Sequence, residues 1–314
     1  MASTSFKKRI IRLTFTLGKG SFGSSGKNTL TIQGLRASVN IQTALAFSSA
    51  ADVTVYGLKQ SDMNALTTYS KLTTIGNISA DELNTILVEV GDKDGMDVVF
   101  YGHIFNAFGD YNNAPNVALR ISASAGLWQR IAPAPAISFK EDFEIAPQLE
   151  ALAKRMGYVF ENSGVTAKLP PTYLAGTAFD QADKLAHDAN INLIYDGRVM
   201  AIFPKGGVRK KTVPILTKDS GLVGYPTFDQ LGMSLQCLYT PRVVFGGAIQ
   251  IEMDRILADA TKANKNPGQN EKQQKIMTTW FVSQCSYYLE SETPGGQWFL
   301  DLRATNISTD AIRV

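Results

Sequence analysis

The stretch VEVGDKDGMDVVF, residues 88–100, gives the clearest indication of the fold. Its two ends, Val88–Val90 and Val98–Phe100, are rich in β-branched and aromatic residues, and Asp94-Gly95 lies between them. Asp and Gly tolerate the positive φ of a tight turn, so this dipeptide between two such runs predicts a β-hairpin. We therefore expect the first third of the chain to be built from strands.

Further strands are predicted on both sides of the hairpin. Residues 51–58 alternate apolar and polar side chains, which is the pattern of a strand with one buried face. A short helix is expected to start at Ser61, as its N-cap, and to run to about Lys71. The strands predicted in this part are Ile10–Thr16, Thr29–Gln33, Ala37–Gln42, Ala51–Leu58, Thr85–Val90, Asp97–Asn106 and Asn116–Ala123.

Residues 132–136, with the sequence APAPA, mark a change of character. Proline has no amide donor and fits neither a helix interior nor a central strand. We therefore expect an extended connector here and a boundary between domains.

Two helices are predicted beyond the connector, over Ala146–Met156 and Ala178–Ala189, because apolar residues recur there at helical spacing. Gly157 stands where the first helix needs a C-cap, and Thr177 with Asp180 forms an imperfect capping box before the second. Together with strands at Tyr158–Phe160, Ile191–Tyr195 and Val199–Phe203, the last two pairing around Asp196-Gly197, these helices predict a small α/β unit within about Phe143–Lys205.

The last third returns to strand-like sequence. Between two of its strands, Ala258–Lys275 is polar, lacks aromatic residues and contains Asn266-Pro267-Gly268, so we expect a long exposed loop, which in a compact domain is functional or disordered. The strands predicted here are Thr212–Leu216, Leu231–Tyr239, Val243–Met253, Ile276–Glu290 and Trp298–Thr305.

The overall charge argues against a dedicated nucleic-acid binder. The 314 residues carry a net charge of +3, without the strong basic stripe that such a binder needs. Charged residues make up 19% of the chain, a little under the usual quarter, which fits surface buried against partners but also an ordinary soluble protein. Two basic clusters are expected to be solvated loops or, alternatively, contacts with an acidic partner. They are Lys205, Arg209, Lys210 and Lys211, and Lys262, Lys265, Lys272 and Lys275.

The cysteines and histidines are too few for most metal or disulfide chemistry. Cys237 and Cys285 lie far apart in strand-like runs, so we expect two buried free thiols and a reducing compartment during folding. His103 and His187 are the only histidines, so one chain cannot supply a multi-histidine zinc site. No apolar run approaches the roughly 18 residues that span a bilayer, so no membrane anchor is expected.

Motifs that suggest catalysis fail in their context. Residues 18–23 match GxGxxG, but strand-like sequence follows where a dinucleotide site needs a helix, and Gly26-Lys27 lacks the other P-loop positions. The acidic run Glu141, Asp142 and Glu144 is a weak candidate for glycoside hydrolysis. We therefore expect no catalytic, cofactor-binding or metal-ligating residues. Trp128, Trp280 and Trp298 are candidate interface anchors, although at least two are expected to pack in a core.

Three stretches resemble one family. ADVTVYGL at residues 51–58 resembles an early strand of bacteriophage tail hub proteins, with Gly57 where Asn is common. VVFYG at residues 98–102 resembles their next strand, and YYLESETPGGQWF at residues 287–299 resembles their closing hairpin. With the order β-rich, α/β, β-rich, the chain resembles the late control protein D type of baseplate hub from contractile-tailed phages, related to the hubs of type VI secretion spikes.

The resemblance implies a mainly β fold with a small α/β insert. Two tube-forming, β-barrel-like domains at 1–130 and 211–314 would flank an α+β domain at 131–210. It also implies a non-enzymatic homotrimer that forms a pseudo-sixfold ring and adapts the hexameric tail tube to the central spike. The implied partners are the tube protein, the spike protein, other baseplate proteins and the tape measure protein. The loop at 258–275 is a candidate contact, and the implied location is the virion, after assembly in the host cytoplasm.

Three other functions stay open at this point. A tail-tube initiator or distal tail ring protein would also be β-rich and ring-forming, but sixfold. A cell-wall hydrolase is less favoured, because the pattern above leaves no room for an added catalytic domain. Binding of single-stranded nucleic acid on a β-barrel needs aromatic side chains in a basic groove, and the small net charge argues against it.

Overall fold

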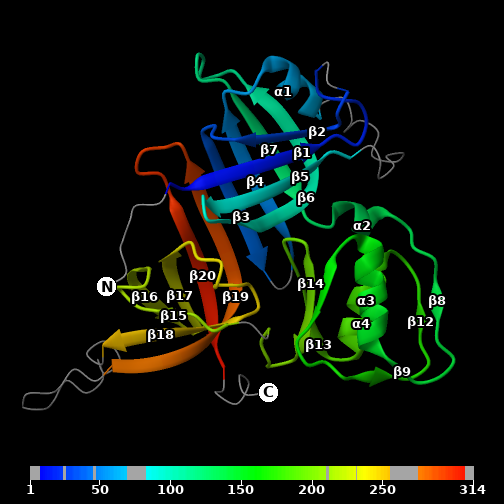
Figure 1. Ribbon diagram of the computed structural model, residues 1–314. Coiled ribbons are helices and arrows are strands. Elements are labelled where there is room, and N and C mark those ends of the chain that lie inside the picture. The colour runs from blue at the N-terminus through cyan, green and yellow to red at the C-terminus, as the bar shows by residue number, and fades with distance from the viewer. Residues whose placement is uncertain are drawn as a thin grey trace, which may run out of the picture.

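A computed structural model describes residues 8–23, 26–44, 47–68, 83–209, 212–230, 232–254 and 275–307. The fold is mainly β, as predicted, and has one large sheet with a small α/β unit beside it (Figure 1). The loop predicted at 258–275 lies outside the described residues except for Lys275, as do Lys71, Lys210 and Lys211. In the described part, no helix has the length and apolar character that crossing a bilayer requires.

The strands of the first third confirm the prediction to within a few residues. The central hairpin closes at the pair Asp92 and Gly95, so Lys93 and Asp94 form the turn. The Asp92 carboxylate accepts a hydrogen bond of 2.7 Å from the Asp94 amide, which fixes that turn. The strands are β1 (Ile10–Thr16), β2 (Thr29–Gln33), β3 (Ala37–Ala44), β4 (Phe47–Tyr56), β5 (Thr85–Asp92), β6 (Gly95–Asp110) and β7 (Ala118–Ser124).

The predicted first helix is shorter and starts elsewhere. Helix α1 spans Gln60–Leu66, and its N-cap is Lys59. The carbonyl of Lys59 already accepts hydrogen bonds from the amides of Asp62 and Met63, so Ser61 lies inside the first turn. The helix ends because Thr67 is extended (ψ 131°). The prediction of Ser61 as N-cap was therefore wrong.

The α/β unit has its own hydrophobic core, although Ile194, Ala201 and Phe203 of the unit pack in the core of the large sheet. Its helices α3 (Ile145–Met156) and α4 (Ala178–Asp188) pack on each other and on a three-stranded sheet. Gly157 caps α3 at φ 80°, as predicted, and Thr177 with Asp180 forms a complete capping box where an imperfect one was predicted. The other elements are α2 (Leu127–Ile131), β8 (Ile137–Ser138), β9 (Phe143–Glu144), β10 (Val159–Asn162), β11 (Lys168–Leu169), β12 (Tyr173–Leu174), β13 (Ile191–Asp196) and β14 (Val199–Pro204).

The last third contains one strand that the sequence did not predict and two that start several residues later than predicted. The run Val243–Met253 becomes a strand only from Ala248, because Gly246 has a φ of 77°. The run Thr212–Leu216 is reduced to two strand residues. The strands are β15 (Ile215–Leu216), β16 (Leu222–Asp229), which was not predicted, β17 (Gly232–Leu238), β18 (Ala248–Asp254), β19 (Lys275–Ser291) and β20 (Trp298–Asn306).

The large sheet contains a structural repeat. Its strand order is β16-β17-β20-β19-β3-β4-β7-β6-β5-β1-β2, with β18 and β15 attached beside β19. The antiparallel order β3-β4-β7-β6-β5 recurs as β16-β17-β20-β19-β18, and we call these the first and second repeat units. The units are joined where β19 pairs with β3, from Gln284 opposite Ala44 to Ser291 opposite Ala37. Figure 1 shows the orange and red strands continuing into the blue ones.

Candidate assembly interface

The residues that first suggested catalysis do not meet in one place. His103 is buried on β6, where burial lowers its pKa, and His187 is exposed on α4. Glu141, Asp142 and Glu144 lie exposed before helix α3. Within the described ranges, no group of three histidine, cysteine or carboxylate side chains is placed to hold a metal ion.

The two cysteines are buried free thiols, as predicted. Cys237 lies on β17 and Cys285 on β19, and both face the core of the large sheet. Burial raises the pKa of Cys237 to about 12 and raises that of Cys285 well above its ordinary value. A thiol in this state is a packing group and a poor nucleophile.

Two of the three tryptophans are core residues, in line with the prediction. Trp298 is buried and lies edge-on to Tyr239, with ring centroids 5.8 Å apart. Trp280 is also buried, next to Phe228. Trp128, on α2, is only half-buried.

One face of the large sheet is polar across both repeat units. Many of the side chains that point away from the core are polar, and neighbouring strands pair some of them. The Ser122 hydroxyl donates to the Asp52 carboxylate at 2.7 Å on β7 and β4, and the Gln236 amide donates to Asp301 at 2.7 Å on β17 and β20. The alternate residues, such as Val53, are buried. The sheet is thus amphipathic, and its polar face suits contact with water or with a polar partner.

Exposed aromatic side chains gather at two edges of the sheet. Tyr225 and Phe228 lie on β16, the terminal strand at one end of the sheet, and are 77% and 56% exposed. Phe105 and Phe108 lie at the far end of β6, where β5 no longer pairs with it, and Tyr111 directly follows that strand. Apolar groups clustered at strand edges are typical of surfaces that become buried against another chain.

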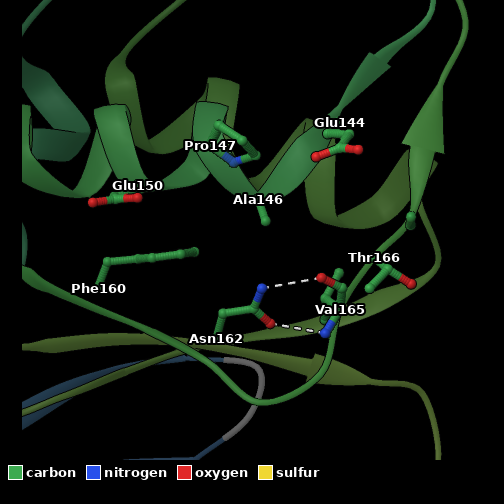
Figure 2. A pocket seen from close by; sticks show the side chains of 9 residues that line it. Glu144, Ala146, Pro147, Glu150, Phe160, Asn162, Val165 and Thr166 are labelled. Atoms are coloured by element: carbon green, nitrogen blue, oxygen red, sulfur yellow. Dashed lines mark hydrogen bonds between the residues drawn. The ribbon is translucent and has the colours of Figure 1, made fainter.

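A pocket of about 490 Å³ opens between the start of α3 and strand β10 (Figure 2). Its floor includes Phe160, and Asn162 holds the opposite wall by bonding both the amide and the carbonyl of Val165, at 2.8 and 3.0 Å. Glu144 and Glu150 stand at its rim, and each has a lysine within ion-pair distance. Each rim carboxylate thus has a lysine of the same chain beside it.

The largest departure from the predicted surface is Arg209. Its guanidinium is buried, whereas the basic cluster containing it was predicted to be solvated. It donates to both carboxylate oxygens of Glu161 at 3.0 Å and to the Phe245 carbonyl at 2.9 Å. A fourth bond, of 2.7 Å, goes to Asp196. Burial alone lowers the pKa of Arg209, but the hydrogen bonds and charges of the two carboxylates outweigh it and raise that pKa.

The Arg209 network fastens the α/β unit to the large sheet. Glu161 and Asp196 belong to β10 and β13 of the unit, and Phe245 precedes β18 of the second repeat unit. Sequence reasoning missed this group because the three contact residues are 13 to 48 positions away from Arg209. The network holds the large sheet and the insert in one arrangement.

Comparison with known proteins gives one family and several similar folds. A family model described as Baseplate hub gp41 matches residues 10–258. Among curated proteins, none matches the chain.

Three solved structures illustrate the fold. A tail protein from Neisseria meningitidis MC58 has a TM-score of 0.58 at 9% identity, over 94% of this chain and 96% of that one. The 43 kDa tail protein of prophage MuSo2 from Shewanella oneidensis has a TM-score of 0.55 at 10% identity, over 95% and 98%. The E. coli c3393 protein, described as a type VI secretion component similar to the T4 tail proteins gp27 and gp5, has 0.51 at 7% identity, over 87% and 74%. At such identities the likeness concerns the fold.

Proposed function

This chain belongs to the Baseplate hub gp41 family and is a structural component of the phage tail baseplate, and we propose that it is the trimeric hub that adapts the hexameric tail tube to the central spike. The family match supports a location in the virion tail. Assembly of the hub in the host cytoplasm is part of the proposal, and the two buried free thiols are consistent with folding in a reducing compartment.

The repeat within the large sheet is the observation that carries the proposal. One chain supplies two copies of the same five-strand order, joined edge to edge by β19 and β3. Three such chains supply six units, the number needed to match a hexameric tube, while keeping the threefold symmetry of a spike. A ring of this kind also covers the sheet edges that a lone chain leaves open.

The proposed domains follow the two hydrophobic cores. We assign residues 1–130 and 211–314 to the two tube-type, β-barrel-like domains and residues 131–210 to the α+β domain. The separate core of the α/β unit supports the middle assignment, and the two repeat units support the outer ones. Both repeat units contribute to one hydrophobic core, which also fits two outer domains packed on each other.

The proposed partners are the tube protein, the spike protein, other baseplate proteins and the tape measure protein. The similarity of the c3393 protein to gp27 and gp5, stated in its own description, supports a spike partner for this fold. We propose that the chain acts through its surfaces and not as an enzyme, in keeping with its family.

Light scattering after size exclusion tests the proposal. The chain has a mass of 34.2 kDa, so a trimer is expected near three times that value, about 100 kDa. A hexamer would favour the tail-tube initiator or distal tail ring protein. A monomer both alone and with added spike protein would contradict the hub assignment.

A further inference from the structure

Among the described residues, two strand edges lack the neighbouring strand that their repeat counterparts have: the edge of β16, and the edge of β6 beyond His103, where only Thr68 bonds to the backbone, at Ala107. β19 of the second repeat unit pairs with β3 of the first. In the repeat, β6 occupies the place of β19, and β16 occupies the place of β3. The junction between β19 and β3 therefore indicates how a second junction, between β6 and β16, would form. One chain cannot form it with itself, because six strands separate β16 from β6 in the sheet.

The two counterpart strands share an irregularity at the same point. Along β19, residues up to Phe281 pair with β18, the register shifts between Val282 and Gln284, and pairing with β3 begins there. Along β6, pairing with β5 ends at His103, and the register shifts between Ile104 and Asn106. The part of β6 that follows its shift thus corresponds to the part of β19 that carries the junction.

Exposure distinguishes the filled junction from the open edges. Val39 and Ile41 of β3 face the core at the filled junction and are 0% exposed. Phe228 of β16 pairs with Met233 and so points to the same core side, yet more than half of its surface is exposed. A neighbouring strand lies beside Val39 and Ile41 but not beside Phe228. An exposed apolar side chain of this kind is expected where a junction is unfilled.

On this basis we infer that the β16 edge of one copy of this chain packs against the 105–111 end of β6 in the next copy. The inference rests on the proposed function and names the surfaces through which the copies meet. Phe105, Phe108 and Tyr111 on one side face Tyr225 and Phe228 on the other. The contact is heterologous, because the two edges differ, so it repeats head to tail, and a rotation of one third of a turn between copies closes it as the proposed trimeric ring.

Side chains carry this contact more than a continuous backbone ladder does. At Ala107 the outer amide already donates to the Thr68 hydroxyl at 2.8 Å, and the carbonyl accepts from the Thr68 amide at 3.1 Å. Those groups are not open to a new strand. Aromatic side chains flank this position on β6 and are the groups that dominate most protein interfaces.

Cross-linking between introduced cysteines tests which edges meet. Asn112→Cys lies just past the end of β6, and Thr227→Cys lies on β16; both positions are exposed, whereas the native thiols are buried. We expect a short bismaleimide to join the double variant into covalent dimers and trimers, and neither single variant to do so. The matched control pairs Thr227→Cys with Thr31→Cys on β2, the other terminal strand, and is expected to give no ladder.

Each outcome of the cross-linking decides a separate point. A ladder from the Thr31→Cys pair, or a dimer from Asn112→Cys alone, overturns the junction between β6 and β16. A trimer by light scattering that gives no cross-link with the Asn112→Cys pair overturns the junction and leaves the hub assignment standing. A monomer without any cross-link, alone and with spike protein, overturns both.

A second experiment removes the exposed aromatic side chains of β16. Phe228→Ser together with Tyr225→Ser is expected to weaken association roughly tenfold or more, because buried aromatic residues are typical interface hot spots. Tyr173→Ser is the control, since Tyr173 is 62% exposed on β12 of the α/β unit. Equal association of both variants and the parent chain, with unchanged circular dichroism, would overturn the inference.

Discussion

Arg209 and Asp196 are joined by a 2.7 Å hydrogen bond from Nη1 to Oδ2, and this pair links the segment after β14 to the end of β13. The Arg209 side chain is 3% exposed, so its charge is satisfied inside the protein. The ion pair, which salt screens little because it is buried, holds the Arg209 guanidinium in place, and its 2.9 Å hydrogen bond to the Phe245 carbonyl then links the α/β unit to the large sheet.

Replacing Arg209 by alanine is expected to destabilise the protein strongly. The substitution removes the cation between the Glu161 and Asp196 carboxylates, whose side chains are each 18% exposed. Breaking a buried ion pair from one side costs about 3–5 kcal/mol, so the free energy of unfolding in urea should fall by about that amount. The control is Arg303→Ala, at an exposed pair with Asp229, with an expected loss under about 1 kcal/mol. Similar losses for the two variants would refute this account.

Gly246→Ala should destabilise more than Gly206→Ala. Both glycines have a positive φ, 77° and 75°, so both substitutions carry a backbone cost of roughly 1–2 kcal/mol. A Cβ at Gly246 would also lie 2.7 Å from Cδ1 of Ile194 and 3.2 Å from Cδ of Arg209, whereas a Cβ at Gly206 meets nothing within 4 Å. Overpacking adds about 1–3 kcal/mol, and the difference between the two melting curves measures it directly.

His103 should make stability fall as the pH drops. Burial lowers its pKa below the ordinary value of 6.5, and its Nδ1 has no hydrogen-bond partner among the described residues. The unfolded chain therefore binds a proton at His103 more readily, and stability present above pH 6.5 is lost progressively below it.

Melting temperatures between about pH 7.5 and about pH 5 test this sign. His103→Gln should flatten the dependence relative to the parent chain. A dependence that His103→Gln leaves unchanged would show that another group is responsible.

Thr177→Ala should weaken the α/β unit. The Thr177 hydroxyl accepts from the Asp180 amide at 3.1 Å, and the Asp180 carboxylate accepts from the Thr177 amide at 2.9 Å. Loss of such an N-cap costs about 0.5–2 kcal/mol. Thr166→Ala, at an exposed position of the same unit, should change the free energy of unfolding by less than about 0.5 kcal/mol. A smaller effect at Thr177 than at Thr166 would contradict the capping role.

Local signals in the sequence were sufficient for most elements. The ends of β1 and β2 agree with the prediction, because alternation and flanking turns mark them, and α4 follows from its spacing and its capping box. Strand β16 was missed because Gly224 and Pro226 interrupt it, and there the register shifts between Val223 and Thr227. Such a strand is defined by its pairing with β17, and this pairing is a tertiary contact that the local sequence does not specify.

The candidate interface was harder to predict than the fold. Arg209 lies in a basic cluster whose sequence is typical of a solvated loop. The sequence around it does not indicate that it pairs with Glu161, which lies 48 positions earlier. The repeat of strand order and the two open edges are relations between distant strands. They appear only when the order of the whole sheet is known.

The junction of β19 with β3 has a consequence for how the protein is made. Ser291 and Leu35, which are joined there by a 3.2 Å hydrogen bond, lie 256 positions apart in the chain. The ribosome therefore synthesises β3 long before β19. During most of translation, the edge of β3 that later pairs with β19 has no such partner. Folding of the finished chain must close this long loop, which slows it. Until then, the last strands of a neighbouring copy fit the waiting edge as well as the chain's own strands do, so crowded synthesis favours exchange of strands between copies.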